Sequence, residues 1–153
     1  MSATLADSRK TRRELQLVTF RCADLLLGLD IGRIQEINRH TDIASVPEAP
    51  QYVCGAINLR GDLATIIDLR TVLGMPRSDV TRRSRNVMVK HNGEMVGLLV
   101  DGVSDIVATS HDRIERPPAN LNGIDGRFFL GVYDMPTEIV VVLDLDEVLT
   151  FEY

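Results

Sequence analysis

The sequence predicts a mainly β fold in which two small five-stranded β-barrels pack side by side, with short helical turns. Three observations support this prediction. Short runs of Val, Ile and Leu recur along the chain and are separated by Gly, Asn, Asp or Pro, as in strands joined by tight turns. Part of the chain is repeated. Strands this short avoid open sheet edges most readily when the sheet curls into a barrel.

The expected elements follow the alternation of apolar runs and turn residues. Residues 1–13 are polar and aperiodic, so we expect a flexible N-terminal tail. Two short helices are expected at Asp68–Gly74 and Asp144–Leu149, each with an aspartate as N-cap and each directly after a strand. Strands are expected at residues 15–21, 25–31, 33–38, 53–59, 63–67, 86–91, 95–101, 103–108, 128–133 and 138–143.

The internal repeat is the most informative feature of the sequence. Residues 28–37 align without a gap to residues 97–106, with Gly, apolar and acidic positions in common. A second match follows in each copy, from Gly55 to Asp68 and from Gly131 to Asp144. The offset is larger for this second match, which predicts about seven extra residues in a loop between Ala108 and Leu130.

The repeat predicts two subdomains of about five strands each. We place subdomain one at residues 20–80 and subdomain two at residues 86–138, with terminal segments that can exchange between the barrels. The polar segment 76–85 separates them. Domains near sixty residues bury only about 60% of their unfolded surface, so the halves should pack together and leave a groove at their junction.

Composition excludes several functional classes. The chain has 153 residues, 44% of them apolar and 25% charged, as in a soluble globular protein. A net charge of −5 argues against nucleic-acid binding, which needs a basic face. We interpret Arg82, Arg83 and Arg85 as part of a solvated linker. No apolar run is long enough for direct membrane insertion, and no signal peptide is evident.

No catalytic or metal-binding pattern is found. Phosphate loops, dinucleotide motifs, nucleophile elbows and zinc-protease motifs are missing from the sequence, so we do not expect an enzyme or a cofactor. The histidines, His40, His91 and His111, are scattered and predict no metal site. Cys22 and Cys54 form no CxxC pair, which favours reduced thiols in a cytoplasmic protein.

Five ordered blocks resemble the CheW-like domain family. GAINLRG at 55–61 followed by IIDLR at 66–70 looks like the family signature, and GLDIGRIQEI at 28–37 resembles the strand pair before it. VGLLVDGVSDIV at 96–107 and IVVVLDLDEVL at 139–149 complete the pattern, which covers residues 14–150. Ala64-Thr65 departs from the family pattern, where an apolar residue and proline are usual, and leaves the shape of that strand open.

The resemblance implies two SH3-like five-stranded barrels and a stand-alone adaptor. It implies two partners, the regulatory domain of a CheA-type histidine kinase and the cytoplasmic hairpin tip of a chemoreceptor, the latter in the groove between the barrels. The protein would then be cytoplasmic and recruited to membrane-associated receptor arrays. The positions that the resemblance makes partner-binding are Ile34, Glu36, Ile37, Gly55, Arg60, Val103 and Ile106.

Two questions stay open at this point. Arg60 has Pro136 as its counterpart in the second copy, so the barrel plan does not require an arginine there; it can tie the turn to a carboxylate or contact a partner. The sequence also leaves open which signalling pathway such an adaptor would serve. An adaptor of a non-flagellar chemosensory pathway is the main alternative, and a small-ligand-binding barrel is the other, although no convergent polar residues are evident.

Overall fold

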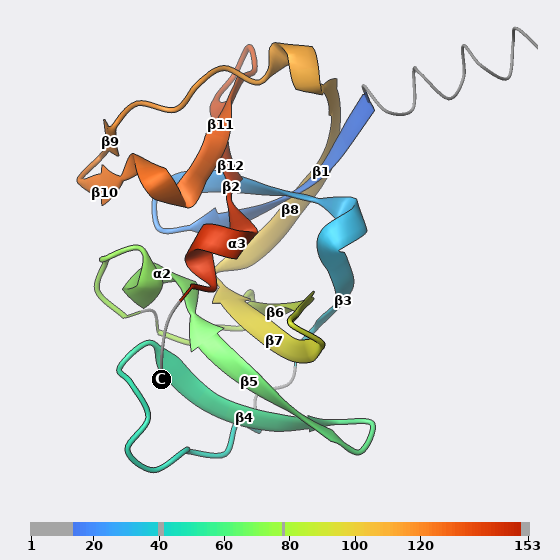
Figure 1. Ribbon diagram of the computed structural model, residues 1–153, viewed down its shortest axis with the longest axis vertical. Coiled ribbons are helices and arrows are strands. Elements are labelled where there is room, and N and C mark those ends of the chain that lie inside the picture. Colours follow the sequence, from blue (N-terminus) through green and yellow to red (C-terminus); the bar gives the residue numbers. More distant parts are fainter. Residues whose placement is uncertain (1–13, 40–41, 78, 151–153) are drawn as a thin grey trace, which may run out of the picture.

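The computed structural model describes residues 14–39, 42–77 and 79–150. The expected tail at 1–13 and His40 lie outside these ranges. Two five-stranded sheets form two barrels, one above the other in Figure 1. The upper barrel has the strand order β11 (Phe129–Asp134), β12 (Ile139–Leu143), β2 (Leu25–Asp30), β1 (Glu14–Cys22), β8 (Gly102–Ser110). The lower barrel has the order β3 (Ile34–Asn38), β6 (Arg85–His91), β7 (Glu94–Val100), β5 (Asp62–Asp68), β4 (Val53–Leu59).

The two barrels are not the two halves of the sequence. The first copy of the repeat contributes β1 and β2 to the upper barrel and β3 to β5 to the lower one, and the second copy does the reverse. The expected limits 20–80 and 86–138 therefore do not describe the barrels, because each pair of leading strands is exchanged. Parallel pairing joins the copies: Val142 lies opposite Gly28 in the upper barrel, and Ile66 lies opposite Gly97 in the lower one.

Both barrels are closed by one short backbone bridge. Ala44 pairs with Ala56 in the lower barrel, and Glu115 pairs with Val132 in the upper one. A glycine makes each approach possible. A Cβ atom on Gly55 would lie 2.2 Å from the Ala44 carbonyl oxygen, and the corresponding Cβ on Gly131 would lie 2.4 Å from that of Glu115. The glycines of the repeat thus serve barrel closure.

The main hydrophobic core lies between the barrels. It is the largest cluster of buried side chains and draws on both sheets, with Phe20 and Leu27 from the upper barrel and Val87 and Leu98 from the lower one. Smaller clusters fill the interiors of the two barrels. Because β2 and β7 bury side chains on both faces, their sequences are continuous apolar runs rather than alternating ones.

Short helices lie at the junction of the barrels in Figure 1. They are α2 (Leu69–Val72) and α3 (Leu145–Val148), each shorter than expected. Asp144 caps α3 by accepting from the Glu147 N–H, whereas Asp68 accepts from the Thr71 hydroxyl instead of a backbone N–H. Strand β5 runs without interruption through Ala64 and Thr65.

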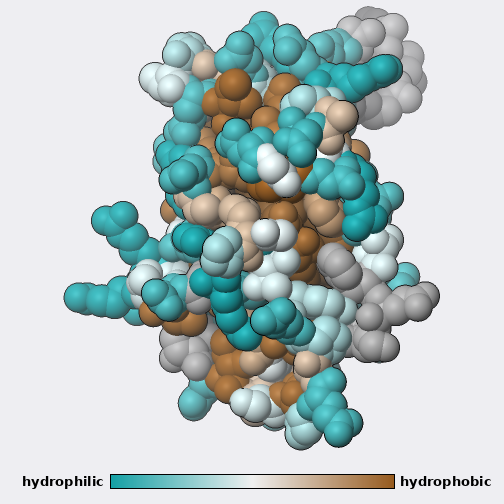
Figure 2. Space-filling model, turned by 90° about the vertical axis from the view of Figure 1, so that its left-hand side faces the viewer, coloured by the Kyte–Doolittle hydropathy of each residue, from teal (hydrophilic) through white to brown (hydrophobic). Residues whose placement is uncertain are grey.

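The predicted insertion in the second copy is confirmed as a loop. It contains a small hairpin of β9 (Asn120–Leu121) and β10 (Ile124–Asp125), followed by the 3-10 helix η3 (Gly126–Phe128). Two further 3-10 helices, η1 (Ile31–Arg33) and η2 (His111–Arg113), were not expected from the sequence. Figure 2 shows brown apolar surface left uncovered between teal polar side chains on the face that carries β9 and β10.

Candidate protein-binding surface

Strands β3 and β8 occupy equivalent edges of the two barrels and carry most of the predicted partner-binding residues. Ile34 and Val103 hold equivalent positions, as do Ile37 and Ile106, because β3 pairs with β6 as β8 pairs with β1. Ile37 is 39% exposed, Val103 38% and Ile106 59%. Ile34 instead packs against the core between the barrels. Three of the four apolar positions therefore offer surface that a partner can cover.

Arg60 lies in the two-residue turn between β4 and β5, where it and Gly61 both have positive φ, as in a type I′ hairpin. Its Nη2 donates to Oε2 of Glu36 on β3 at 3.1 Å. The structure thus shows the tie to a carboxylate. The Arg60 side chain is nevertheless 74% exposed, and only Nη2 is engaged within the described residues. Most of its donors face solvent.

Gly55 is placed differently from the other predicted residues. It is buried under the Ala44–Ala56 bridge, so its role in the structure is close packing of the backbone. Among the seven predicted residues, only Glu36 and Arg60 are joined by a side-chain hydrogen bond or ion pair in the described parts of the chain. Of the others, Ile34 and Ile37 lie on β3, Val103 and Ile106 on β8, and Gly55 on β4.

A cleft of about 690 Å³ lies beside β8, where the chain crosses from one barrel to the other. Arg21 at its edge is paired with Glu138 through two hydrogen bonds of 2.8 and 2.9 Å. Arg83 and Arg85 have no carboxylate partner within the described residues. The cleft is lined by Arg21, Arg83, Arg85, Asp101, Gly102, Val103 and Ser104.

The sequence predicted a groove at the junction of the barrels but not the arginines that line this cleft. Arg83 and Arg85 were interpreted as parts of a solvated linker; Arg83 lies two residues before β6 and Arg85 begins it, and both line the cleft together with Val103. The only local signal was three arginines within four positions. Their uncompensated charge favours an acidic group on whatever binds beside β8.

One carboxylate organises the crossing point between the barrels. Asp101 accepts from Nε of Arg70 at 3.0 Å and from the Ala23 N–H at 2.7 Å, so it connects α2 with the turn between β1 and β2. The neighbouring Cys22 is buried. Burial, and next the charge of Asp101, raise the pKa of the Cys22 thiol to about 12. This thiol is protonated at neutral pH and suited to packing rather than to nucleophilic chemistry.

No metal-binding cluster is found on the described part of the chain. Within it, no group of three His, Cys, Asp or Glu side chains could hold a metal ion, and both cysteines are free. Among the described residues there is also no helix with the length and apolar character needed to cross a membrane. The paired five-stranded barrels with apolar edge strands define the chain as a small double β-barrel protein.

Comparison with known proteins identifies the family. The CheW-like domain matches residues 16–152, so the chain belongs to the CheW-like family. It is 33% identical to "Chemotaxis protein CheW" of Rhizobium meliloti (strain 1021), over 97% of this chain and 96% of that protein. It is 32% identical to "Probable chemotaxis protein CheW" of Rhizobium etli, over 86% and 84%.

A solved structure confirms the fold. The scaffolding protein CheW from Thermoanaerobacter tengcongensis superposes with a TM-score of 0.82 at 30% identity, covering 90% of this chain and 89% of that one. The predicted fold class and the family resemblance are therefore confirmed. Family and structural neighbour together indicate a non-catalytic adaptor in chemotaxis.

Proposed function

We propose that this chain couples methyl-accepting chemoreceptors to a CheA-type histidine kinase in cytoplasmic signalling arrays at the membrane, without catalysing a reaction. The supporting observation is the pair of equivalent edge strands, which expose similar apolar side chains but differ in charge. Glu36 on β3 pairs with Arg60 of the β4–β5 turn, whereas β8 borders a cleft with two arginines that have no carboxylate partner among the described residues. Two related strands can thus bind two different partners.

We further propose that the receptor hairpin tip binds in the cleft beside β8, since this cleft lies where the chain crosses between the barrels, and that the kinase regulatory domain binds around β3. A body of this size offers about 800 Å² or less to each partner, so single contacts should have near-micromolar affinity. Durable assembly then depends on the avidity of an array.

Reconstitution with a receptor cytoplasmic fragment and the kinase tests this proposal. The chain should increase receptor-dependent kinase phosphorylation and hydrolyse no ATP alone. Ile106→Glu should reduce receptor binding but spare kinase binding, while Val46→Glu, a change at another exposed apolar residue, should alter neither. ATP hydrolysis by the chain itself, or no stimulation of the kinase, would refute the adaptor role.

A non-flagellar chemosensory pathway is the second candidate. "Protein FrzA" of Myxococcus xanthus is 24% identical over 67% of this chain, and it is a relative whose name does not specify chemotaxis. Co-purification from the native cell would identify the receptors and kinase that the chain serves.

A further inference from the structure

The segment that leads into β6 is a hydrogen-bonded turn rather than a free linker. The Thr81 N–H donates to Oγ of Ser84 at 2.8 Å, and the Ser84 N–H donates to the Thr81 carbonyl at 3.1 Å. The Arg83 N–H donates to Oγ1 of Thr81 at 3.2 Å. Ser84 is buried, so the turn is anchored in the barrel. The backbone that carries Arg83 and Arg85 is therefore fixed beside β8.

Both arginines line the cleft with donors that no described residue uses. Nη1 of Arg85 donates to the carbonyl oxygens of Arg82 at 2.9 Å and of Ser84 at 2.8 Å, which orient its planar group without cancelling its charge. Its Nε and Nη2 atoms have no hydrogen-bond partner among the described residues. Arg83 lies against the start of β8, where a Cβ on Gly102 would be 3.6 Å from the Arg83 carbonyl oxygen. Arg83 and Arg85 are called the arginine pair below.

The other charged residues of the cleft lining are compensated. Arg21 forms an ion pair with Glu138, and Asp101 forms one with Arg70. Asp105, the next acidic residue along β8, lies outside the lining. The arginine pair therefore gives the cleft a positive charge that its own lining does not balance, although the whole chain has a net charge of −5.

The repeat shows that the barrel plan does not require these arginines. The leading strands of the two copies align without a gap, because the β1–β2 and β6–β7 turns have the same length. In this alignment, Arg83 and Arg85 correspond to Glu14 and Gln16 at the start of β1. The positive charge is thus specific to the second copy, as Arg60 is to the first.

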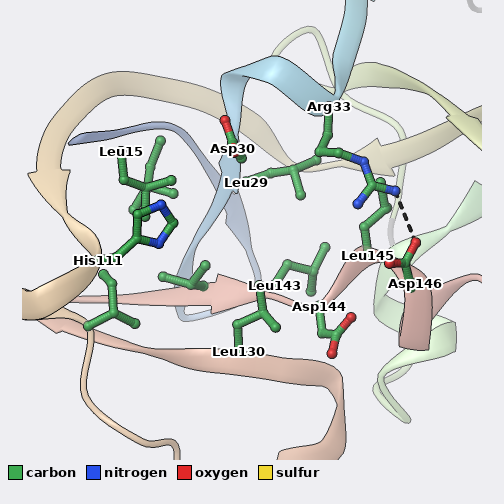
Figure 3. Close-up of a pocket in the computed structure, with 13 residues that line it drawn as sticks. Leu15, Leu29, Asp30, Arg33, His111, Leu130, Leu143, Asp144, Leu145 and Asp146 are labelled. Atoms are coloured by element: carbon green, nitrogen blue, oxygen red, sulfur yellow. Dashed lines mark hydrogen bonds and ion pairs between the residues drawn. The ribbon is translucent and has the colours of Figure 1, made fainter. Parts of the chain in front are cut away.

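A second opening, a pocket of about 450 Å³ at the end of the upper barrel, offers a contrast. Figure 3 shows its leucine walls with Asp30 on one side and Asp144 on the other, so these carboxylates do not converge on one point. Its arginine, Arg33, donates to Asp146 at 3.0 Å and is already compensated. Of these two openings, only the cleft beside β8 favours an acidic group on a partner.

We propose that Arg83 and Arg85 bind a carboxylate on one helix of the receptor hairpin tip, one helical turn from an apolar residue that covers Val103. This inference rests on the proposed function and names the chemistry of that contact. Arginine's planar fork donates two parallel hydrogen bonds to a carboxylate. Val103 lines the same cleft and is 38% exposed. Residues three or four apart share one helix face, so a single helix can make both contacts.

The test measures binding of the whole chain to a receptor cytoplasmic fragment that contains the hairpin tip. Arg83→Glu should weaken this binding about tenfold, because it places a negative charge against the partner's carboxylate. Arg83→Lys keeps the charge but loses the fork, so its affinity should lie between those of the native chain and Arg83→Glu. Arg82→Glu is the matched control: it makes the same charge change on an exposed neighbour outside the lining, and should weaken binding less than about twofold.

Two further measurements locate the effect. Arg83→Glu and Arg82→Glu should melt at the temperature of the native chain, because both side chains are exposed, and both should bind the kinase regulatory domain normally. Replacing each acidic residue of the hairpin tip by lysine in turn should yield one fragment that restores binding of Arg83→Glu.

The outcomes separate this inference from the adaptor role. Equal weakening by Arg82→Glu and Arg83→Glu, or failure of every lysine replacement to restore binding, would overturn the inference while the native chain still binds receptor and stimulates the kinase. A native chain that does not bind the receptor fragment would overturn both.

Discussion

The two barrels share one plan and differ at their ends and edges. Strand order, parallel pairing and the closing glycines Gly55 and Gly131 are the same in both. The lower barrel is filled by Met88 and Leu99, where the upper barrel has Thr19 and Asp30. The duplicated residues that hold the backbone and the central core are kept, whereas those at the barrel ends are free to specialise.

The two short helices also share one arrangement but differ in their residues: each forms an ion pair, and the positive and negative partners are exchanged between them. Arg70 of α2 pairs with Asp101 after β7, and Asp146 of α3 pairs with Arg33 after β2. Each pair connects a helix with the point where the chain crosses to the other barrel. Asp101 and Arg33 are one position apart in the repeat, and the sign of each charge is exchanged. Both copies therefore place an ion pair at this point, made by different residues.

The largest effect is expected in the core between the barrels. Leu27→Ala should cost about 2–5 kcal/mol, because it leaves a cavity at a fully buried position among side chains from both sheets. Since strands are exchanged, fluorescence and circular dichroism should report one common unfolding transition in denaturant. Two separate transitions would show that the barrels unfold independently. Leu63→Ala, at a highly exposed position, is the control and should cost less than about 0.5 kcal/mol.

Barrel closure comes next. Gly55→Ala and Gly131→Ala should each cost about 2–3 kcal/mol, because the new Cβ would overlap a carbonyl oxygen of the closing bridge. Gly123→Ala is the matched change, with a positive φ but no atom within 4 Å of the added Cβ, and should cost about 1 kcal/mol. Thermal melts of the three variants measure these losses. Gly131 has no positive φ, so a loss in Gly131→Ala no larger than in Gly123→Ala would show that overlap with the closing bridge does not determine the cost.

The two reversed ion pairs should differ in strength. Arg70→Ala removes a partly buried pair and, among the described residues, leaves Asp101 with only the Ala23 N–H, so a loss of about 1–2 kcal/mol is expected. Arg33→Ala breaks a more exposed pair, screened by solvent, and should cost less than about 0.5 kcal/mol. Urea denaturation at low and high salt measures both. A larger loss for Arg33→Ala would contradict this ranking of the two junctions.

Most strands could be predicted from the sequence because they are local patterns bounded by turn residues. The barrel to which each strand belongs could not be predicted from the sequence. The pairing of Gly28 with Val142 joins segments more than a hundred residues apart, and no local pattern records it. The same limit hid the pocket between Asp30 and Asp144. Among the seven predicted partner-binding positions, sequence resemblance could not separate buried Gly55 from exposed Ile106, because exposure depends on the bridge at Ala44.

The smallest effect on stability is expected at Arg60, where function and fold can be separated. The Arg60 side chain is 74% exposed, so Arg60→Ala should change the free energy of unfolding by less than about 0.5 kcal/mol. Arg60→Gly should be slightly more stable than Arg60→Ala, because φ is +52° and glycine adopts it without steric cost.

These two Arg60 variants remove the same charge in turns of different stability. If Arg60 contacts a partner, both should reduce receptor-dependent kinase stimulation equally, although their melting temperatures differ. If the arginine only supports the turn, stimulation should follow stability and recover in Arg60→Gly. Pro136 stands at the equivalent turn of the upper barrel, so a contact made by Arg60 would belong to the lower barrel alone.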